Sequence, residues 1–86
     1  MPFVSMLFGI VIRMFYKEHN PPHFHAEYQG QEASFDFDGN IVEGKMKSRT
    51  AQWLIREWTV LHREELMRNW ERAAAKETIE KIDPLD

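Results

Sequence analysis

Residues 23–36, HFHAEYQGQEASFD, decide the fold because two segments of alternating polarity flank the dipeptide Gln29-Gly30. Such alternation is typical of strands, and a two-residue loop that ends in glycine predicts a β-hairpin. This loop fixes the register, which pairs His23 with Asp36 and His25 with Ser34. One hairpin face is then apolar, with Phe24, Ala26, Ala33 and Phe35. The other is polar, with His23, His25, Glu27, Glu32, Ser34 and Asp36. A slip by one residue would destroy this sorting, so the sequence itself supports the register.

Further strands are expected on both sides of the hairpin. The stretch GIVI at residues 9–12 predicts a central strand, because its residues are β-branched and both of its faces are apolar. Residues 3–8 are either another short strand or an edge that pairs with a second copy of the chain. The two prolines in residues 19–22 predict a turn or an extended corner. Residues 38–40, Asp-Gly-Asn, predict a turn before a short return strand at residues 41–42.

The hydrophobic period becomes helical after Ser48, a candidate N-cap. The apolar positions that then share one face are Ala51, Leu54, Ile55, Trp58 and Leu61. The phase slips at residues 61–63, which predicts two helices, at about 48–61 and 63–76, or one strongly kinked helix. Glu65 follows His62 by three residues, as in a capping box, and favours the break. The expected fold is therefore α+β: a small antiparallel meander of three to four strands followed by two C-terminal helices packed on one face.

Size and composition restrict the class of protein. The 86 residues predict a single domain over 1–86, with a β-sheet half at 1–43, a helical half at 48–76 and a tail at 77–86. The formal net charge of −3 counts against a dedicated duplex-DNA binder, which is usually basic. The sequence contains no cysteine, which excludes disulfides and thiolate metal ligands and agrees with a cytoplasmic location. The apolar N-terminus lacks the features of a secretory signal, and charged residues interrupt it too early for a membrane span. We therefore expect no membrane association.

Several segments resemble the bacterial family known as domain of unknown function 4160. The most specific is the Pro-Pro-His-x-His run at residues 21–25. The supporting segments are the opening Met-Pro, the strand GIVIRM at residues 9–14, the turn at 43–45 and the helical stretches at 56–58, 62–66 and 69–71. The resemblance implies a small stand-alone protein without an established activity. It also implies a gene beside that of another small domain, in a pair that resembles a toxin–antitoxin unit, and some relatives carry a transcriptional regulator label. No catalytic residue follows from it.

The histidines form a candidate metal site. His23 and His25 are two residues apart on a predicted strand, so both rings leave the same face, with Cα atoms about 6.5–7 Å apart. Glu27 extends the same row, and His19 can approach from the proline corner as a fourth ligand. Two imidazoles and a carboxylate suit zinc, iron or manganese. The alternative is an ordinary polar strand face, or one that contacts another ligand.

The same face also carries a candidate catalytic set. His23 is predicted to lie opposite Asp36, and a carboxylate in that place can fix the tautomer of a histidine and raise its basicity. With His25, the set then has the acid and base for metal-free RNA cleavage through the 2′-hydroxyl. The alternative is a cross-strand pair without a function.

A basic stretch is the candidate nucleic-acid contact. No acidic residue interrupts residues 44–56, whose basic side chains near the start of the first helix can bind phosphate: Lys45, Lys47, Arg49 and Arg56. The alternative is a solvated loop. Three tryptophans at helical spacing are expected in the core or an interface, although exposed indoles can also stack on bases: Trp53, Trp58 and Trp70.

Two classes of function remain. The favoured one is a non-enzymatic binding or regulatory module of a toxin–antitoxin-like gene pair. Its partner is a second copy of the chain, as the apolar N-terminus indicates, or a small protein from the neighbouring gene. The alternative is a small ribonuclease or metal-dependent hydrolase that uses the face with His23, His25 and Asp36.

Overall fold

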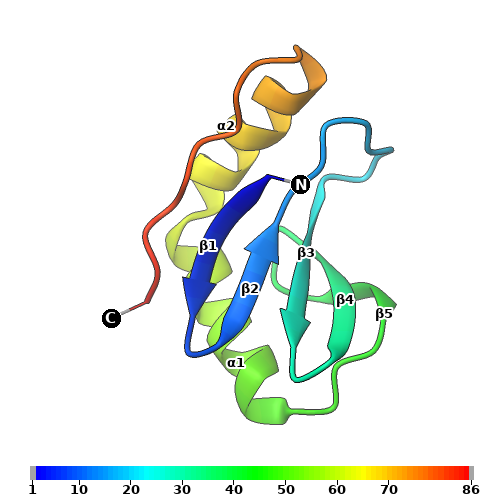
Figure 1. Ribbon diagram of the computed structural model, residues 1–86, viewed down its shortest axis with the longest axis vertical. Helices are drawn as coiled ribbons and strands as arrows, with labels where there is room; N and C mark the ends of the chain where they lie inside the picture. Colours follow the sequence, from blue (N-terminus) through cyan, green and yellow to red (C-terminus); the bar gives the residue numbers. More distant parts are fainter. Residues whose placement is uncertain (1, 86) are drawn as a thin grey trace.

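The computed structural model describes residues 2–85, so Met1 and Asp86, the ends of the predicted domain, lie outside the described residues. Figure 1 shows five strands followed by two helices: β1 (Phe3–Leu7), β2 (Ile10–Arg13), β3 (His23–Tyr28), β4 (Gln31–Asp36), β5 (Ile41–Gly44), α1 (Arg49–Leu61) and α2 (Arg63–Ala74). The strands form one antiparallel sheet in chain order. The α+β class is confirmed, whereas the expected count of three to four strands is wrong.

The sheet has five strands because the first segment pairs within its own chain. β1 and β2 form a hairpin whose turn residues, Phe8 and Gly9, have φ angles of 50° and 80°. Positive φ at both central residues matches the twist of a tight two-residue hairpin. The segment at 41–44 supplies the strand at the other edge of the sheet.

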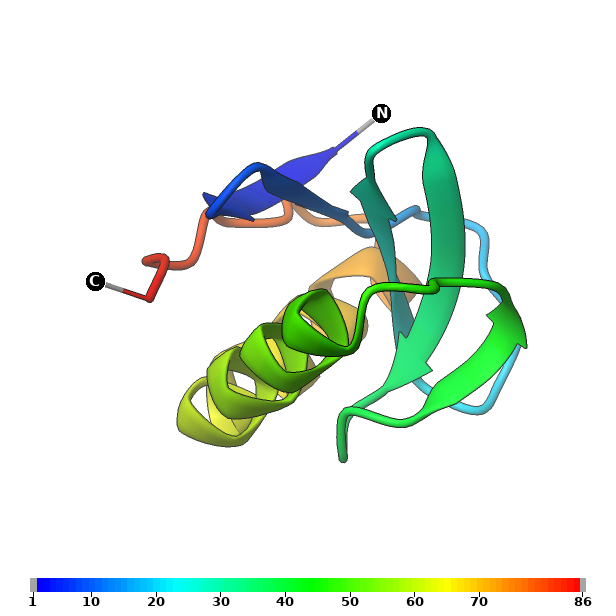
Figure 2. The same ribbon diagram turned by 90° about the horizontal axis from the view of Figure 1, so that it is seen from below.

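The central hairpin has the predicted register, in which His23 pairs with Asp36 and His25 with Ser34. Its apolar face lies in the core. Phe24 and Phe35 stack with ring centroids 5.7 Å apart, and Trp58 of α1 meets Phe24 edge-on at 5.6 Å. Figure 2 shows the sheet curving around α1, which lies on its concave face. The polar side chains of β3 and β4 alternate with these core residues and therefore lie on the opposite face of the two strands.

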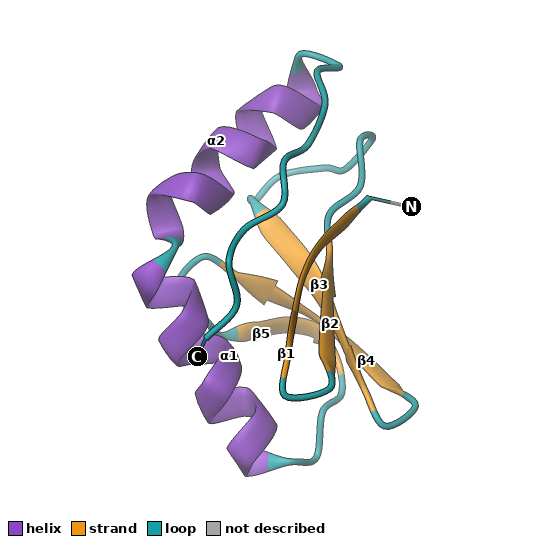
Figure 3. Cartoon of the chain, turned by 60° about the vertical axis from the view of Figure 1, so that its left-hand side comes forward, coloured by secondary structure: helices purple, strands orange, loops and turns teal. Residues whose placement is uncertain are grey.

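The predicted break between the helices is confirmed. Figure 3 shows α1 and α2 as two segments of one bent column. The Ser48 side chain caps α1 by accepting a hydrogen bond from the backbone N–H of Ala51 at 3.0 Å. At the break, His62 Nδ1 lies 2.5 Å from a carboxylate oxygen of Glu65. This contact joins two side chains and does not cap the backbone of α2.

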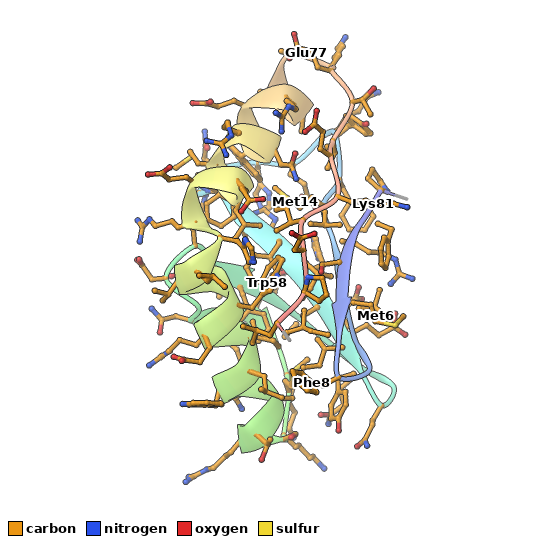
Figure 4. The ribbon with its side chains drawn as sticks, turned by 90° about the vertical axis from the view of Figure 1, so that its left-hand side faces the viewer. Met6, Phe8, Met14, Trp58, Glu77 and Lys81 are labelled. Carbon is orange, nitrogen blue, oxygen red and sulfur yellow. The ribbon has the colours of Figure 1, made fainter. Side chains whose placement is uncertain are left out.

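The segment after α2 runs back between the helices and β1, as Figure 3 shows. Ile79 and Ile82 are buried, and the Ile82 N–H donates to the Val4 carbonyl of β1 at 2.9 Å. Figure 4 shows Trp58 and Met14 in the layer between helices and sheet, where the Trp58 indole donates to the Asp83 carbonyl at 2.8 Å. Within residues 2–85, neither helix is long and apolar enough to cross a membrane.

Candidate metal centre

Glu18, His23 and His25 converge on the outer face of β3. The chain leaves β2, passes the proline corner and enters β3 at His23, which brings Glu18 back over the start of that strand. Glu18 Oε1 lies 2.6 Å from His25 Nε2, and Glu18 Oε2 lies 3.4 Å from His23 Nε2. One ligand atom from each of the three residues lies within 4.8 Å of the other two. We call these three residues the Glu18 cluster.

The second nitrogen of each ring has its own partner. His23 Nδ1 lies 2.8 Å from the Pro21 carbonyl oxygen. Because a carbonyl only accepts, Nδ1 carries the proton, and in the neutral ring the lone pair of Nε2 faces Glu18. His25 Nδ1 lies 3.2 Å from the Ser34 hydroxyl, which can either donate or accept. Both rings are thus oriented by the contact of Nδ1, with Nε2 directed at the carboxylate. Histidines that bind metals are commonly held in this way, with the other ring nitrogen bonded to a neighbouring group.

The cluster is shielded from solvent. His23 is only 6% exposed, and its ring lies 5.4 Å from the ring of Trp70 on α2. The Phe15 ring meets His25 edge-on at 4.6 Å. Burial raises the pKa of Glu18, but the hydrogen bond and charge of His25, with a smaller contribution from His23, outweigh burial, so that this pKa lies below its usual value. Glu18 is therefore ionised at neutral pH, as a metal ligand must be.

Two further residues proposed as ligands lie outside the cluster. The side chain of His19 is 81% exposed, and its Nδ1 lies 3.8 Å from Glu18 Oε2, so it borders the cluster from solvent. Glu27 forms an ion pair with Arg13 on β2, at 2.8 Å. Glu18, which the sequence analysis did not include, holds the position expected for the carboxylate. The sequence did contain a signal for Glu18: it is an acidic residue just before the proline corner, and this corner leads directly into the start of β3.

The proposed catalytic set is only partly assembled. Asp36 is the register partner of His23, but Asp36 Oδ1 accepts hydrogen bonds from the backbone N–H groups of Asp38 and Asn40, both at 2.9 Å. The carboxylate therefore holds the turn after β4. His23 is oriented instead by Pro21.

The basic candidates are all exposed. Lys45 and Lys47 precede α1, and Arg56 donates to Asn40 Oδ1 at 2.8 Å. Arg49 and Arg56 line one pocket together with Trp53. Of the three tryptophans, Trp58 is fully buried and Trp70 half-buried, as expected for core positions, whereas Trp53 is exposed.

One ligand pair of the Glu18 cluster, Glu18 Oε2 and His23 Nε2, has the spacing of a tetrahedral zinc site. Ligand atoms about 2.0–2.1 Å from zinc lie roughly 3.3 Å apart, close to the 3.4 Å between Glu18 and His23. The 2.6 Å contact with His25 is a hydrogen bond to the other carboxylate oxygen, Oε1, and this distance would widen by less than about 1 Å on binding. His23 can bind in its present tautomer. His25 would bind through Nε2 after its proton moves to Nδ1, and the Nδ1–H would then donate a hydrogen bond to the Ser34 hydroxyl.

One family model, described as Domain of unknown function (DUF4160), matches residues 9–71. The match includes Glu18, the proline corner, the central hairpin, α1 and most of α2. No curated protein and no solved structure matches the chain. The match covers well over half of the 86 residues and confirms the resemblance noted in the sequence, so the chain belongs to the DUF4160 family.

Proposed function

We propose that this protein is a small binding module whose ligand is one divalent transition-metal ion, held by Glu18, His23 and His25. One observation carries the proposal: both Nε2 atoms face one ionised carboxylate, while both Nδ1 atoms already have partners in Pro21 and Ser34. A neutral His23 directs a lone pair at the carboxylate, and two acceptors 3.4 Å apart gain from a shared cation. A metal ion between the two acceptor atoms, or a proton on one of them, removes the repulsion between their lone pairs.

The donor set favours zinc or iron over harder ions. Two imidazole nitrogens and one carboxylate oxygen are typical of both metals, while manganese prefers more oxygen ligands. Three protein ligands leave at least one coordination position for water or another group. His19 is the nearest candidate, since its ring centroid lies 5.6 Å from that of His23 and its side chain is exposed.

The role of the bound ion is proposed as regulatory. In this role the chain would belong to a bacterial toxin–antitoxin-like gene pair and would act in the cytoplasm with a small partner protein or with a second copy. Transcriptional regulation is one form such a role could take. The exposed Phe3, Met6 and Phe8 on β1 and its turn are available to a partner.

One observation keeps a hydrolase as the second candidate. A pocket of about 250 Å³ opens beside His23, with Pro21, Ser34 and Glu43 also in its lining. A metal-bound water there would have a lowered pKa and could attack a phosphodiester or another ester. The engagement of Asp36 in the turn counts against the metal-free acid–base alternative.

The test compares metal binding by two carboxylate variants. Tag-free protein is stripped with chelator and titrated with zinc, iron(II) and manganese(II) by calorimetry. We expect about one equivalent of zinc or iron to bind the wild type, and binding to be lost in Glu18→Gln and His25→Gln. Glu27→Gln is the matched control and should bind normally, because Glu27 pairs with Arg13. Wild type that binds no ion, or a Glu27→Gln variant as impaired as Glu18→Gln, would contradict the proposal.

A thermal measurement adds a readout that does not depend on activity. An ion at 100 times its Kd stabilises the folded state by about 2.7 kcal/mol. In a domain of this size, each kcal/mol raises Tm by roughly 4–8 °C. Zinc should therefore raise the Tm of wild type and of Glu27→Gln by about 10–20 °C, whereas the Tm of Glu18→Gln should stay nearly the same.

Turnover separates the two candidate roles. A hydrolase loaded with zinc should cleave single-stranded RNA or an activated phosphodiester and lose this activity in Glu18→Gln. A binding module should cleave neither substrate with any of the metals tested, although it still binds zinc.

A further inference from the structure

We infer that the solvent-facing side of α1 binds single-stranded nucleic acid, with Trp53 stacking on a base and Arg49 and Arg56 holding the adjacent phosphates. These three residues are called the α1 platform. The inference is independent of the metal proposal, because it uses none of the residues of the Glu18 cluster.

The first observation is the exposure of Trp53. Its side chain is 60% exposed, although α1 buries Ala51, Ile55 and Trp58 against the sheet. Because residues at i, i+4 and i+7 share one side of a helix, the α1 platform forms a row along α1 with Trp53 in the middle position.

The second observation is a pocket of about 290 Å³ at this row. Gly39, Gln52 and the three platform residues line it. The turn packs directly on the helix here, because a Cβ on Gly39 would come within 2.9 Å of the Arg56 Cα. The Arg56 side chain is also held from this turn, by its hydrogen bond to Asn40 Oδ1. The pocket thus has a fixed wall and room for one base.

The third observation is the local charge. The pocket lining contains two arginines and no acidic residue. Lys45 and Lys47 are exposed just before α1, and no aspartate or glutamate occurs between Glu43 and Glu57. An aromatic ring flanked by cations is the arrangement by which proteins bind single strands, since each base offers a stacking face and each phosphate a charge. A duplex hides its bases from such stacking, and the acidic net charge of −3 disfavours a long duplex footprint.

The experiment measures binding of labelled single-stranded octamers, rU8 and dT8, by fluorescence anisotropy at 50 mM salt, with a duplex octamer as comparison. Wild type should bind both single strands more tightly than the duplex. Trp53→Ala should weaken this binding by at least about fivefold, because stacking contributes that much or more per base. The matched control is Arg68→Gln on α2, an exposed arginine outside the pocket, which should bind like wild type.

Two further measurements identify the contact. Addition of dT8 should quench tryptophan emission in wild type and leave the emission of Trp53→Ala unchanged. The dependence of log K on log salt should become shallower by about 0.7 in Arg49→Gln, the loss of one phosphate contact on a single strand. A preference for rU8 over dT8 would assign the ligand as RNA and the reverse as DNA, provided that both depend on Trp53.

Two results would overturn the inference. One is wild-type protein that binds neither octamer at 50 mM salt. The other is binding that survives both Trp53→Ala and Arg49→Gln. Circular dichroism of the variants excludes unfolding as the cause of any loss, and both side chains are exposed enough for the fold to tolerate their replacement.

Discussion

Replacement of Asn69 by aspartate tests how the C-terminal segment is held. Asn69 is fully buried on α2 and binds the backbone of Glu80 through two hydrogen bonds. Its Nδ2 donates to the Glu80 carbonyl at 2.8 Å, and its Oδ1 accepts from the Glu80 N–H at 3.0 Å. Arg72 also donates to Oδ1, at 2.9 Å. Aspartate keeps the size and the acceptor but loses the donor, so a carboxylate oxygen would face the Glu80 carbonyl.

The magnitude follows from these contacts. The lost hydrogen bond contributes about 1 kcal/mol, and a polar group left without a partner costs about 1–3 kcal/mol more. Arg72 remains beside the carboxylate and offsets part of this cost. We therefore expect Asn69→Asp to lower the free energy of unfolding by about 2–3 kcal/mol. That is a large part of the total of a small domain, which is roughly 4–13 kcal/mol at this length.

Urea denaturation of wild type and variant, followed by circular dichroism, measures this difference. Asn40→Asp is the matched control, because its exposed side chain uses only an acceptor oxygen toward Arg56, and it should change stability by less than about 0.5 kcal/mol. Hydrogen exchange at the Ile82 N–H, which bonds to Val4 of β1, should accelerate in Asn69→Asp if the segment detaches. A free energy of unfolding within about 0.5 kcal/mol of wild type would refute the reasoning, since water would then replace the hydrogen bond from Asn69 to Glu80 without loss of stability.

Three other changes have defined outcomes. In the presence of chelator, the free energy of unfolding of wild type should fall as the pH drops from about 4.5 toward the lowered folded pKa of Glu18. A carboxyl group whose pKa is lowered by folding stabilises the fold above this pH range and loses that contribution within it. Urea titrations at each pH should show a weaker fall for Glu18→Gln. Gly44→Ala should cost more than about 2 kcal/mol, since its φ is +86° and a Cβ would lie 2.6 Å from the Glu32 carbonyl oxygen. Gly30→Ala, with φ +78° and nothing within 4 Å, should cost only about 1 kcal/mol, and equal losses of Tm in the two would contradict the steric argument. His62→Phe removes the buried Nε2, which has no hydrogen-bond partner within residues 2–85, together with the contact between Nδ1 and the partly exposed Glu65, so the midpoint of unfolding should change little. A loss above about 2 kcal/mol would mean that the contact with Glu65 stabilises the junction.

Local patterns predicted the hairpin and the helix break well. The register of β3 and β4 follows from a two-residue turn and from alternation over six residues, which are both visible in a short stretch. The break after Leu61 follows from a phase slip in the same way. Leu61 itself was expected on the core stripe, yet it is 65% exposed, because the helix ends there and the chain bends away.

Local patterns could not predict the place of Glu18 in the cluster or the hydrogen bonds of Asn69 to Glu80, because each depends on contacts between parts of the chain that are separated in the sequence. Glu18 reaches His25 only after the chain has turned through the proline corner, and sequence spacing does not give the direction of its return. Asn69 pairs with a backbone segment that has no regular structure and hence no periodic signal. The sequence therefore identified the two histidines of the cluster and assigned its carboxylate to Glu27 instead.

The two proposed sites should act independently, and their positions in the fold give the reason. The Glu18 cluster lies on the outer face of β3, whereas α1 covers the inner face and directs Trp53 away from it. The sheet and the body of α1 thus separate the sites, and sites that share no partner usually contribute additively. The zinc-bound and zinc-free proteins should therefore bind dT8 with affinities within about twofold of each other. A larger change on zinc addition, abolished in Glu18→Gln, would mean that the ion alters the packing of α1 through β3, and the protein would then be a metal-controlled nucleic-acid binder.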